Sequence, residues 1–125
     1  MKRIVILLLL LVFLSCELEE IDITAIDYKP KEIEYKVACT TGPVDLTIEN
    51  SSGGTSQFND MATPWSYVFE VNRPEYGYVF VYVSAQNQQN SGTVTAQIYI
   101  DGSLYKISTS TGAYVIATAS GGVEW

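Results

Sequence analysis

Residues 91–119 read SGTVTAQIYIDGSLYKISTSTGAYVIATA, and this stretch decides the fold. Its centre is Asp101-Gly102, a pair that tolerates the positive φ angles of a two-residue type I′ turn. Such a turn predicts the pairs Ile100–Ser103, Ile98–Tyr105, Ala96–Ile107 and Val94–Thr109. Opposed residues share a face, which gives the hairpin one apolar face made of Val94, Ala96, Ile98, Ile100, Tyr105 and Ile107. A second sheet has to cover that face, so the stretch predicts a β-sandwich.

The rest of the chain after Pro30 consists of short alternating segments separated by turn residues. Strand patterns occupy residues 33–40, 44–49, 55–61, 65–71, 78–85 and 113–119, and the last of them ends at Ser120-Gly121-Gly122. No stretch shows the 3.6-residue apolar period of a helix. Seven or eight short strands with turns at a spacing of roughly eight to twelve residues are typical of an all-β, immunoglobulin-like antiparallel β-sandwich. We expect this fold for residues 33–125.

Residues 1–15 are predicted to be a lipoprotein signal peptide. Lys2 and Arg3 precede the apolar run Ile4–Leu14, which is too short for a membrane-spanning helix of roughly 20 residues. The run ends at Ser15-Cys16, which resembles a bacterial lipobox and implies cleavage before Cys16 and acylation of that residue. A retained N-terminal anchor and an ordinary secretory signal are the alternatives.

Residues 16–32 are expected to form an acidic tether between lipidated Cys16 and the sandwich. Seven of the 14 acidic residues lie between Glu17 and Glu34. This start resembles the signal that exports many Bacteroidota lipoproteins to the outer face of the outer membrane, while the alternative is a solvated spacer extended by charge repulsion. We therefore expect a lipid-anchored protein of the bacterial cell envelope, in the outer membrane and facing the surface rather than the periplasm.

Composition argues against several function classes. Without its signal peptide the chain keeps five basic residues against 14 acidic ones, so nucleic acid is not an expected partner and membrane attachment would depend on the acyl chains of Cys16. The sequence has no histidine, which removes the commonest general base and metal ligand. Cys39 lies in phase with apolar residues and is expected to be a core residue. We expect no catalytic residue, metal or cofactor, and hence no enzyme.

Aromatic residues are the best candidates for binding a partner. Tyr76, Tyr78, Phe80 and Tyr82, here called the aromatic row, recur at period two, and valines fill the opposite phase. Only one phase can face the interior. If the valines point inward, the aromatic row lies outside and can stack on a sugar or a protein partner. Alternatively, the rings fill the core or the tether covers them. Trp65 is a further candidate, with the core or the rim as its alternative position.

Four short motifs occur in one order along the chain. They are Thr63-Pro64-Trp65-Ser66, Val83-Ser84-Ala85-Gln86-Asn87, Ser91-Gly92 through Ile98-Tyr99-Ile100-Asp101-Gly102, and Thr111-Gly112-Ala113-Tyr114. This order resembles the MmpS family, the small accessory proteins of mycobacterial RND-type (MmpL) exporters. The resemblance implies an anchored, immunoglobulin-like sandwich outside the membrane. It also implies cysteines at Ala96 and Ala119, so this chain lacks both partners of that disulfide, and its anchor is a lipobox instead of a helix.

Two functions are therefore expected. The first is a non-catalytic envelope lipoprotein that assists or docks to another envelope component, such as an RND-type exporter. The second is a surface-exposed recognition or structural module that binds a glycan or other surface proteins, since fold alone does not decide function.

Overall fold

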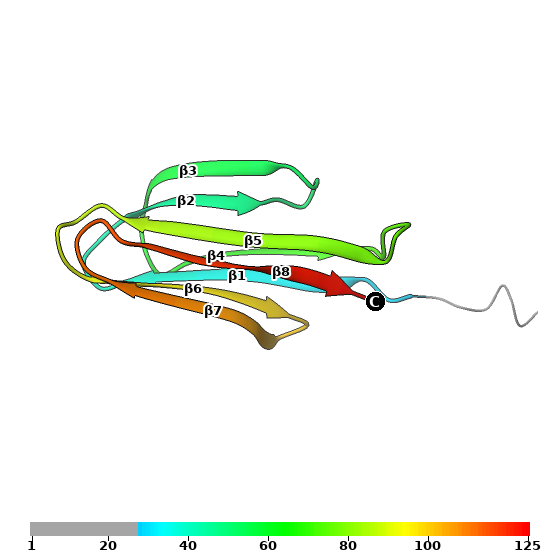
Figure 1. The fold of residues 1–125 in the computed structure, drawn as a ribbon. Coiled ribbons are helices and arrows are strands. Elements are labelled where there is room, and N and C mark those ends of the chain that lie inside the picture. Colours follow the sequence, from blue (N-terminus) through cyan, green and yellow to red (C-terminus); the bar gives the residue numbers. More distant parts are fainter. Residues whose placement is uncertain (1–27) are drawn as a thin grey trace, which may run out of the picture.

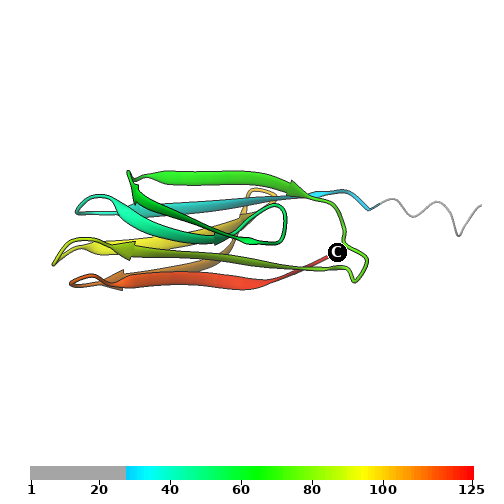
Figure 2. The ribbon, with the colours of Figure 1, turned by 90° about the horizontal axis from the view of Figure 1, so that it is seen from above.

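The computed structural model describes residues 28–125, so the predicted signal peptide, Cys16 and most of the acidic tether lie outside the described residues. Eight strands form two four-stranded antiparallel sheets packed face to face (Figures 1 and 2). The strands are β1 (Lys31–Cys39), β2 (Val44–Glu49), β3 (Thr55–Met61), β4 (Trp65–Val71), β5 (Tyr78–Asn87), β6 (Thr93–Ile100), β7 (Ser103–Thr111) and β8 (Ile116–Glu124). The predicted all-β sandwich is confirmed. Within this part of the chain, no helix could span a membrane.

The two sheets have the strand orders β4-β1-β6-β7 and β3-β2-β5-β8. The chain enters β1 at the same end of the sandwich as the C-terminus, which we call the tether end (Figure 1). The β2–β3, β4–β5 and β6–β7 connections also lie there, and the other connections lie at the opposite end, which we call the loop end. Both sheets are open, so β3, β4, β7 and β8 are edge strands.

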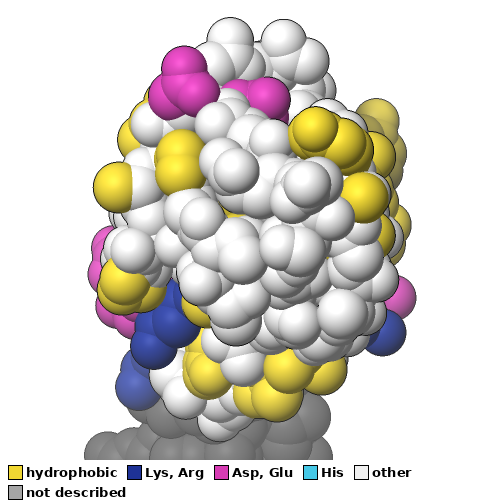
Figure 3. All heavy atoms as spheres, turned by 90° about the vertical axis from the view of Figure 1, so that its left-hand side faces the viewer, with side chains coloured by type: hydrophobic (Ala, Val, Ile, Leu, Met, Phe, Trp, Pro, Cys, Tyr) yellow, Lys and Arg dark blue, Asp and Glu magenta, His cyan; other side chains and the backbone are white. Residues whose placement is uncertain are grey.

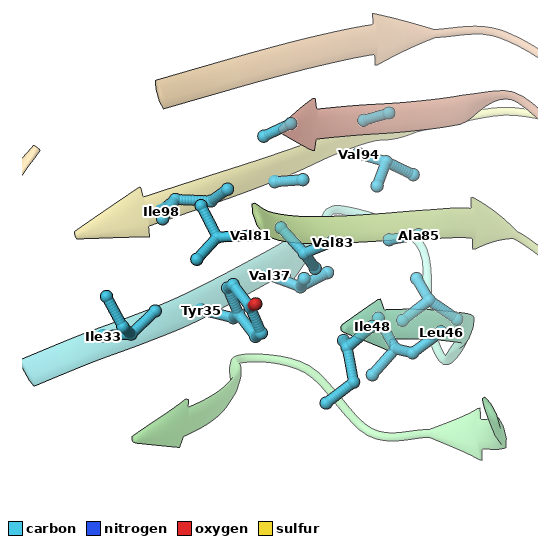
Figure 4. Packing of buried hydrophobic residues seen from close by; sticks show 14 of the residues in the cluster. Ile33, Tyr35, Val37, Leu46, Ile48, Val81, Val83, Ala85, Val94 and Ile98 are labelled. Atoms are coloured by element: carbon cyan, nitrogen blue, oxygen red, sulfur yellow. The ribbon is translucent and has the colours of Figure 1, made fainter. Parts of the chain in front are cut away.

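The core lies between the sheets and takes alternate residues from five strands, β1, β2, β5, β6 and β8, as period-two patterning requires (Figure 4). The buried side chains are those of Ile33, Tyr35, Val37, Val44, Leu46, Ile48, Val81, Val83, Ala85, Val94, Ala96, Ile98, Ala117, Ala119 and Val123. The three strands β2, β3 and β4 have the predicted bounds. β1 starts at Lys31, two residues before the expected Ile33, because Lys31 already pairs with Val71 of β4.

The β6–β7 hairpin corrects part of the predicted register. Asp101 and Gly102 have φ angles of 49° and 80°, and Ile100 pairs with Ser103, both as predicted. A register shift follows at once, since Ile98 pairs with Lys106 instead of Tyr105. Further along, Ala96 pairs with Ser108 and Val94 with Ser110. The extra residue in β7 inverts its phase.

This inversion changes the predicted apolar face of the hairpin. Ile107 pairs with Gln97 and is 55% exposed on the outer face, so its predicted inward position is wrong. Tyr105, the bulged residue, still reaches across to the facing sheet, where its hydroxyl donates a hydrogen bond to the carbonyl of Gly122. The covered face of this hairpin therefore comes mainly from β6.

The last strand was predicted too early in the chain. It runs over Ile116–Glu124 and includes Gly121 and Gly122, whereas Ala113 belongs to the preceding turn. These glycines leave room for aromatic rings. An added Cβ would lie 2.7 Å from Cε1 of Tyr105 at position 121 and 2.0 Å from Cε2 of Tyr78 at position 122. The glycine pair therefore permits close packing of rings on a strand and does not end it.

Candidate binding surface on strand β5

The aromatic row lies on the outer surface of the sandwich. Val81 and Val83 are fully buried, so the opposite phase of β5 faces outward. Tyr78 is 50% exposed and Phe80 is 46% exposed, whereas Tyr82 is half-buried. Tyr76 precedes the strand, in the β4–β5 connection, and is 89% exposed. Of the arrangements open from the sequence, core filling by these rings is therefore excluded.

The rings of the row contact one another and strand β8, and the acidic residue Glu124 pairs with Tyr78 at the tether end. The Phe80 and Tyr82 ring centroids are 6.2 Å apart with an interplanar angle of 30°. Tyr78 lies against Gly122, the β8 residue that pairs with Phe80. Towards the loop end the same face continues with hydroxyl groups, including a hydrogen-bonded pair between Ser84 and Thr118 with an oxygen separation of 3.0 Å. Such a surface offers open ring faces beside groups that can donate or accept hydrogen bonds.

A groove of about 270 Å³ lies beside the row at the tether end. Its apolar lining comes from Phe69 and Val71 of β4 and from Val79 of β5, and its polar lining includes Asn50 and Ser51 of the β2–β3 turn. The groove exists because β2 is shorter than β5, so the two sheets are not closed over each other here. We did not predict it from the sequence, although the unequal strand lengths were a visible signal.

Tyr35 lies in the core behind the aromatic row and holds β5 in position by hydrogen bonds. Its buried hydroxyl donates to the carbonyl of Glu49 at 2.8 Å and accepts from the backbone N–H of Tyr82 at 3.3 Å. The hydroxyl thus links the end of β2 to the middle of β5, just beyond their last pair, Ile48–Val83. Burial raises the pKa of Tyr35 to about 12, because the phenolate would lose its hydration there.

Trp65 is not part of this surface. It starts β4, in the other sheet, and is half-buried against the core. Its ring stacks on Tyr67 with a centroid separation of 6.3 Å and also approaches Phe58 at 6.0 Å. With Pro64 and outward residues of β1 and β6 it lines a separate pocket of about 340 Å³. The structure therefore places Trp65 at the rim of the sandwich and apart from the aromatic row.

The loop end is built around one buried amide. Asn87 is fully buried, and its Nδ2 donates to the Ser91 carbonyl at 2.7 Å. Its Oδ1 accepts from the Gln89 N–H at 3.0 Å and from the Thr41 hydroxyl at 3.3 Å. The surface formed by these loops is mostly uncharged and polar (Figure 3). The amide therefore ties the β1–β2 connection to the β5–β6 connection.

Cys39 lies next to this amide and is half-buried, not a fully buried core residue. Its Sγ is 3.6 Å from the oxygen atoms of both Thr41 and Asn87. Within residues 28–125 it forms no disulfide, and no cluster of three or more potential metal ligands is present in the same range.

Compared with known proteins, the chain matches no protein-family model and no curated protein sequence. The resemblance to the MmpS family therefore stays a prediction that depends on the order of its four motifs. The two alanines that occupy the expected cysteine positions, Ala96 and Ala119, are both buried and lie on the facing sheets, in β6 and β8.

Proposed function

We propose that this chain is a lipid-anchored protein of the bacterial cell envelope whose β-sandwich binds a partner and catalyses no reaction. Its anchor is the acylated Cys16, and the outer membrane with the domain facing the surface is the proposed location. The partner that we propose is a glycan bound on the aromatic row. This choice favours the recognition function among the two functions that the sequence leaves open.

The outward position of Tyr78, Phe80 and Tyr82 is the observation that supports a glycan. A ring face carries negative partial charge and attracts the positively polarised C–H groups of a sugar ring. The Tyr78 ring lies so close to Gly122 of β8 that a Cβ at position 122 would collide with it. The hydroxyl pair of Ser84 and Thr118 supplies hydrogen-bonding groups on the same face. Aromatic side chains of this kind commonly dominate binding energies.

Assistance to an RND-type exporter is the second candidate, and it depends on the order of the four MmpS-like motifs. It differs from the first in its partner, which would be a transporter component and not a glycan. Recovery of such a component from membranes together with the lipidated protein would favour this candidate.

A glycan-binding titration with matched variants tests the proposal. The whole chain in detergent micelles is titrated by calorimetry with a panel of neutral and acidic polysaccharides. We expect Phe80→Ser/Tyr82→Ser to weaken binding by at least about tenfold, as for central aromatic contacts. Leu104→Ser/Ile107→Ser is the matched control, because these side chains are 51% and 55% exposed on the outer face of the other sheet.

The lipid anchor on Cys16 is tested by membrane fractionation of cells that produce a Cys16 variant. Cys16→Ala should either be released from the membrane fraction of producing cells or stay there with its signal peptide uncleaved, while its affinity for the glycan stays unchanged. Binding of no polysaccharide in the panel, or an equal loss in the Leu104/Ile107 control, would contradict a role for the aromatic row. Retention of the Cys16 variant in membranes after its signal peptide has been cleaved would contradict the lipid anchor but not the glycan site.

A further inference from the structure

The first half of β5 has an open edge. β2 pairs with β5 from Val44–Asn87 to Ile48–Val83 and then ends, so among the described strands residues 78–82 pair with β8 alone. Figure 2 shows the β2–β3 hairpin ending well short of the start of β5. We call residues 78–82 the open edge of β5.

Backbone groups on this edge point towards the groove side. The Tyr82 N–H points away from β8, because it donates to the Tyr35 hydroxyl. Backbone groups of alternate residues in a strand point to the same side. The N–H and C=O groups of Phe80 and Tyr78 therefore also point away from β8. An edge of this kind can accept another strand by main-chain hydrogen bonding.

The groove determines what kind of strand would fit. Its floor is apolar and is formed by Phe69, Val71 and Val79, all of them partly buried against the core. The outward-facing side chains of an added strand would lie next to the aromatic row and would be exposed to solvent. A strand added here would need apolar side chains in one phase and could carry polar side chains in the other.

The chain itself contains such a segment immediately before the described residues. Residues 21–26 read IDITAI, with Ile21, Ile23 and Ala25 in one phase and no glycine or proline. As a strand, the six residues of this segment would span roughly 20 Å, which is enough to cover the five residues of the open edge.

The point where the chain leaves the domain lies close to the start of β5, where the Trp125 N–H donates to the Gly77 carbonyl at 3.4 Å. The Arg73 guanidinium is 3.9 Å from the centroid of the Tyr28 ring, and Arg73 belongs to the connection that leads into β5. The Lys29 carbonyl accepts from Nε1 of Trp125 at 3.0 Å. A segment that returned from Tyr28 along the open edge would pass Tyr78 first and Tyr82 last, which is the antiparallel direction.

We propose that residues 21–26 add to the open edge of β5 as a short antiparallel strand, with Ile21 and Ile23 in the groove. This strand extends the β3-β2-β5-β8 sheet beside β5 where β2 has ended. The inference goes beyond the proposed function and does not depend on the identity of the glycan or on lipidation. If Cys16 is acylated, only residues 17–20 separate the docked strand from the anchor, and the domain is held close to the membrane.

Amide hydrogen exchange on the whole chain in detergent micelles tests this strand. We expect slow exchange at Tyr78 and Phe80 in the wild type. Ile21→Asn/Ile23→Asn should accelerate exchange at these two amides by about tenfold or more, as for the loss of a local structural unit. Asp22→Asn/Thr24→Asn is the matched control, since it changes the opposite phase and should leave the rates unchanged. Unchanged protection of residues 83–87 shows that the domain remains folded in each variant.

Three results would overturn the proposal. The first is fast exchange at Tyr78 and Phe80 in the wild type, and the second is equal protection in both double variants. The third is protection that is the same in the wild type and both double variants and that disappears when the protein is diluted. This result would mean that the open edge pairs with a second copy of the protein.

Discussion

The two halves of β5 differ in almost every respect except their alternating sequence. Residues 83–87 pair with β2 on one side and β8 on the other, and they end in the fully buried Asn87. Residues 78–82 pair with β8 and present half-exposed rings. The closed half therefore supports the fold and the open half is available for contacts. One strand can carry both roles because its neighbour β2 ends between them.

The largest effect is expected at the end of the closed half. Asn87→Ala removes the side-chain acceptor of the Gln89 N–H and one hydrogen bond each from the Thr41 hydroxyl and the Ser91 carbonyl, which remain bonded to each other at 2.8 Å. An unsatisfied polar group at a buried site is costly, so we expect the free energy of unfolding to fall by about 1–3 kcal/mol. Denaturant titration measures this change.

Gln86→Ala is the matched control for Asn87→Ala. Gln86 is the preceding residue, is exposed, and makes one side-chain hydrogen bond at 3.2 Å to the Tyr114 carbonyl. We expect its effect to stay within about 0.5 kcal/mol. Similar losses in the two variants would show that the buried amide does not organise the loop end.

The intermediate effect is expected at Tyr35, where the two halves meet. Its folded-state pKa is raised to about 12 from the usual 10, so folding opposes ionisation. The associated stability is fully present below pH 10 and is lost as the pH rises through 12. Two pKa units correspond to a loss of roughly 2.7 kcal/mol at most. Unfolding free energies measured at about pH 8 and about pH 11 should show part of this decrease.

Tyr35→Phe separates this ionisation from other alkaline effects. The variant should lose about 1–2 kcal/mol at neutral pH, because the Glu49 carbonyl and the Tyr82 N–H lose their partner. Its stability should then decline less than that of the wild type between the two pH values. An identical decline in both chains would mean that Tyr35 is not the titrating group.

The smallest effect on stability is expected in the open half. Gly122→Ala places a Cβ where Tyr78 now lies and should displace that ring from β8. The ring is half-exposed and can move, so the free energy of unfolding should change by less than about 1 kcal/mol. Glycan affinity should nevertheless fall. Ser120→Ala on the same strand is the control, and equal affinities for the two variants would exclude Tyr78 from the site.

Local sequence patterns predicted much of the fold because they act over few residues. Asp101-Gly102 marked its turn, and alternation located β2, β3 and β4 with the observed bounds. The bulge at Tyr105 was missed because it adds one residue without changing the composition of the strand. Gly121 and Gly122 were expected to end the last strand, because the rings that require glycine at these positions, Tyr105 and Tyr78, are distant in the sequence.

Only part of the candidate site could be predicted from the sequence. Both phases of residues 78–83 are apolar, so the pattern identified the aromatic row but could not decide which way it faced. Asn87 was identified as part of a motif but not as a structural residue, because its partner Thr41 lies in a different connection, 46 residues away.

By itself, the sequence determined that this protein is an all-β sandwich of short strands with an acidic N-terminal region and a row of aromatic residues in one phase. These properties depend on neighbours one or two positions away. The tertiary structure alone decided that the row faces outward and that β2 leaves half of β5 open. Those outcomes depend on how two sheets divide the available apolar side chains between a shared interior and the solvent.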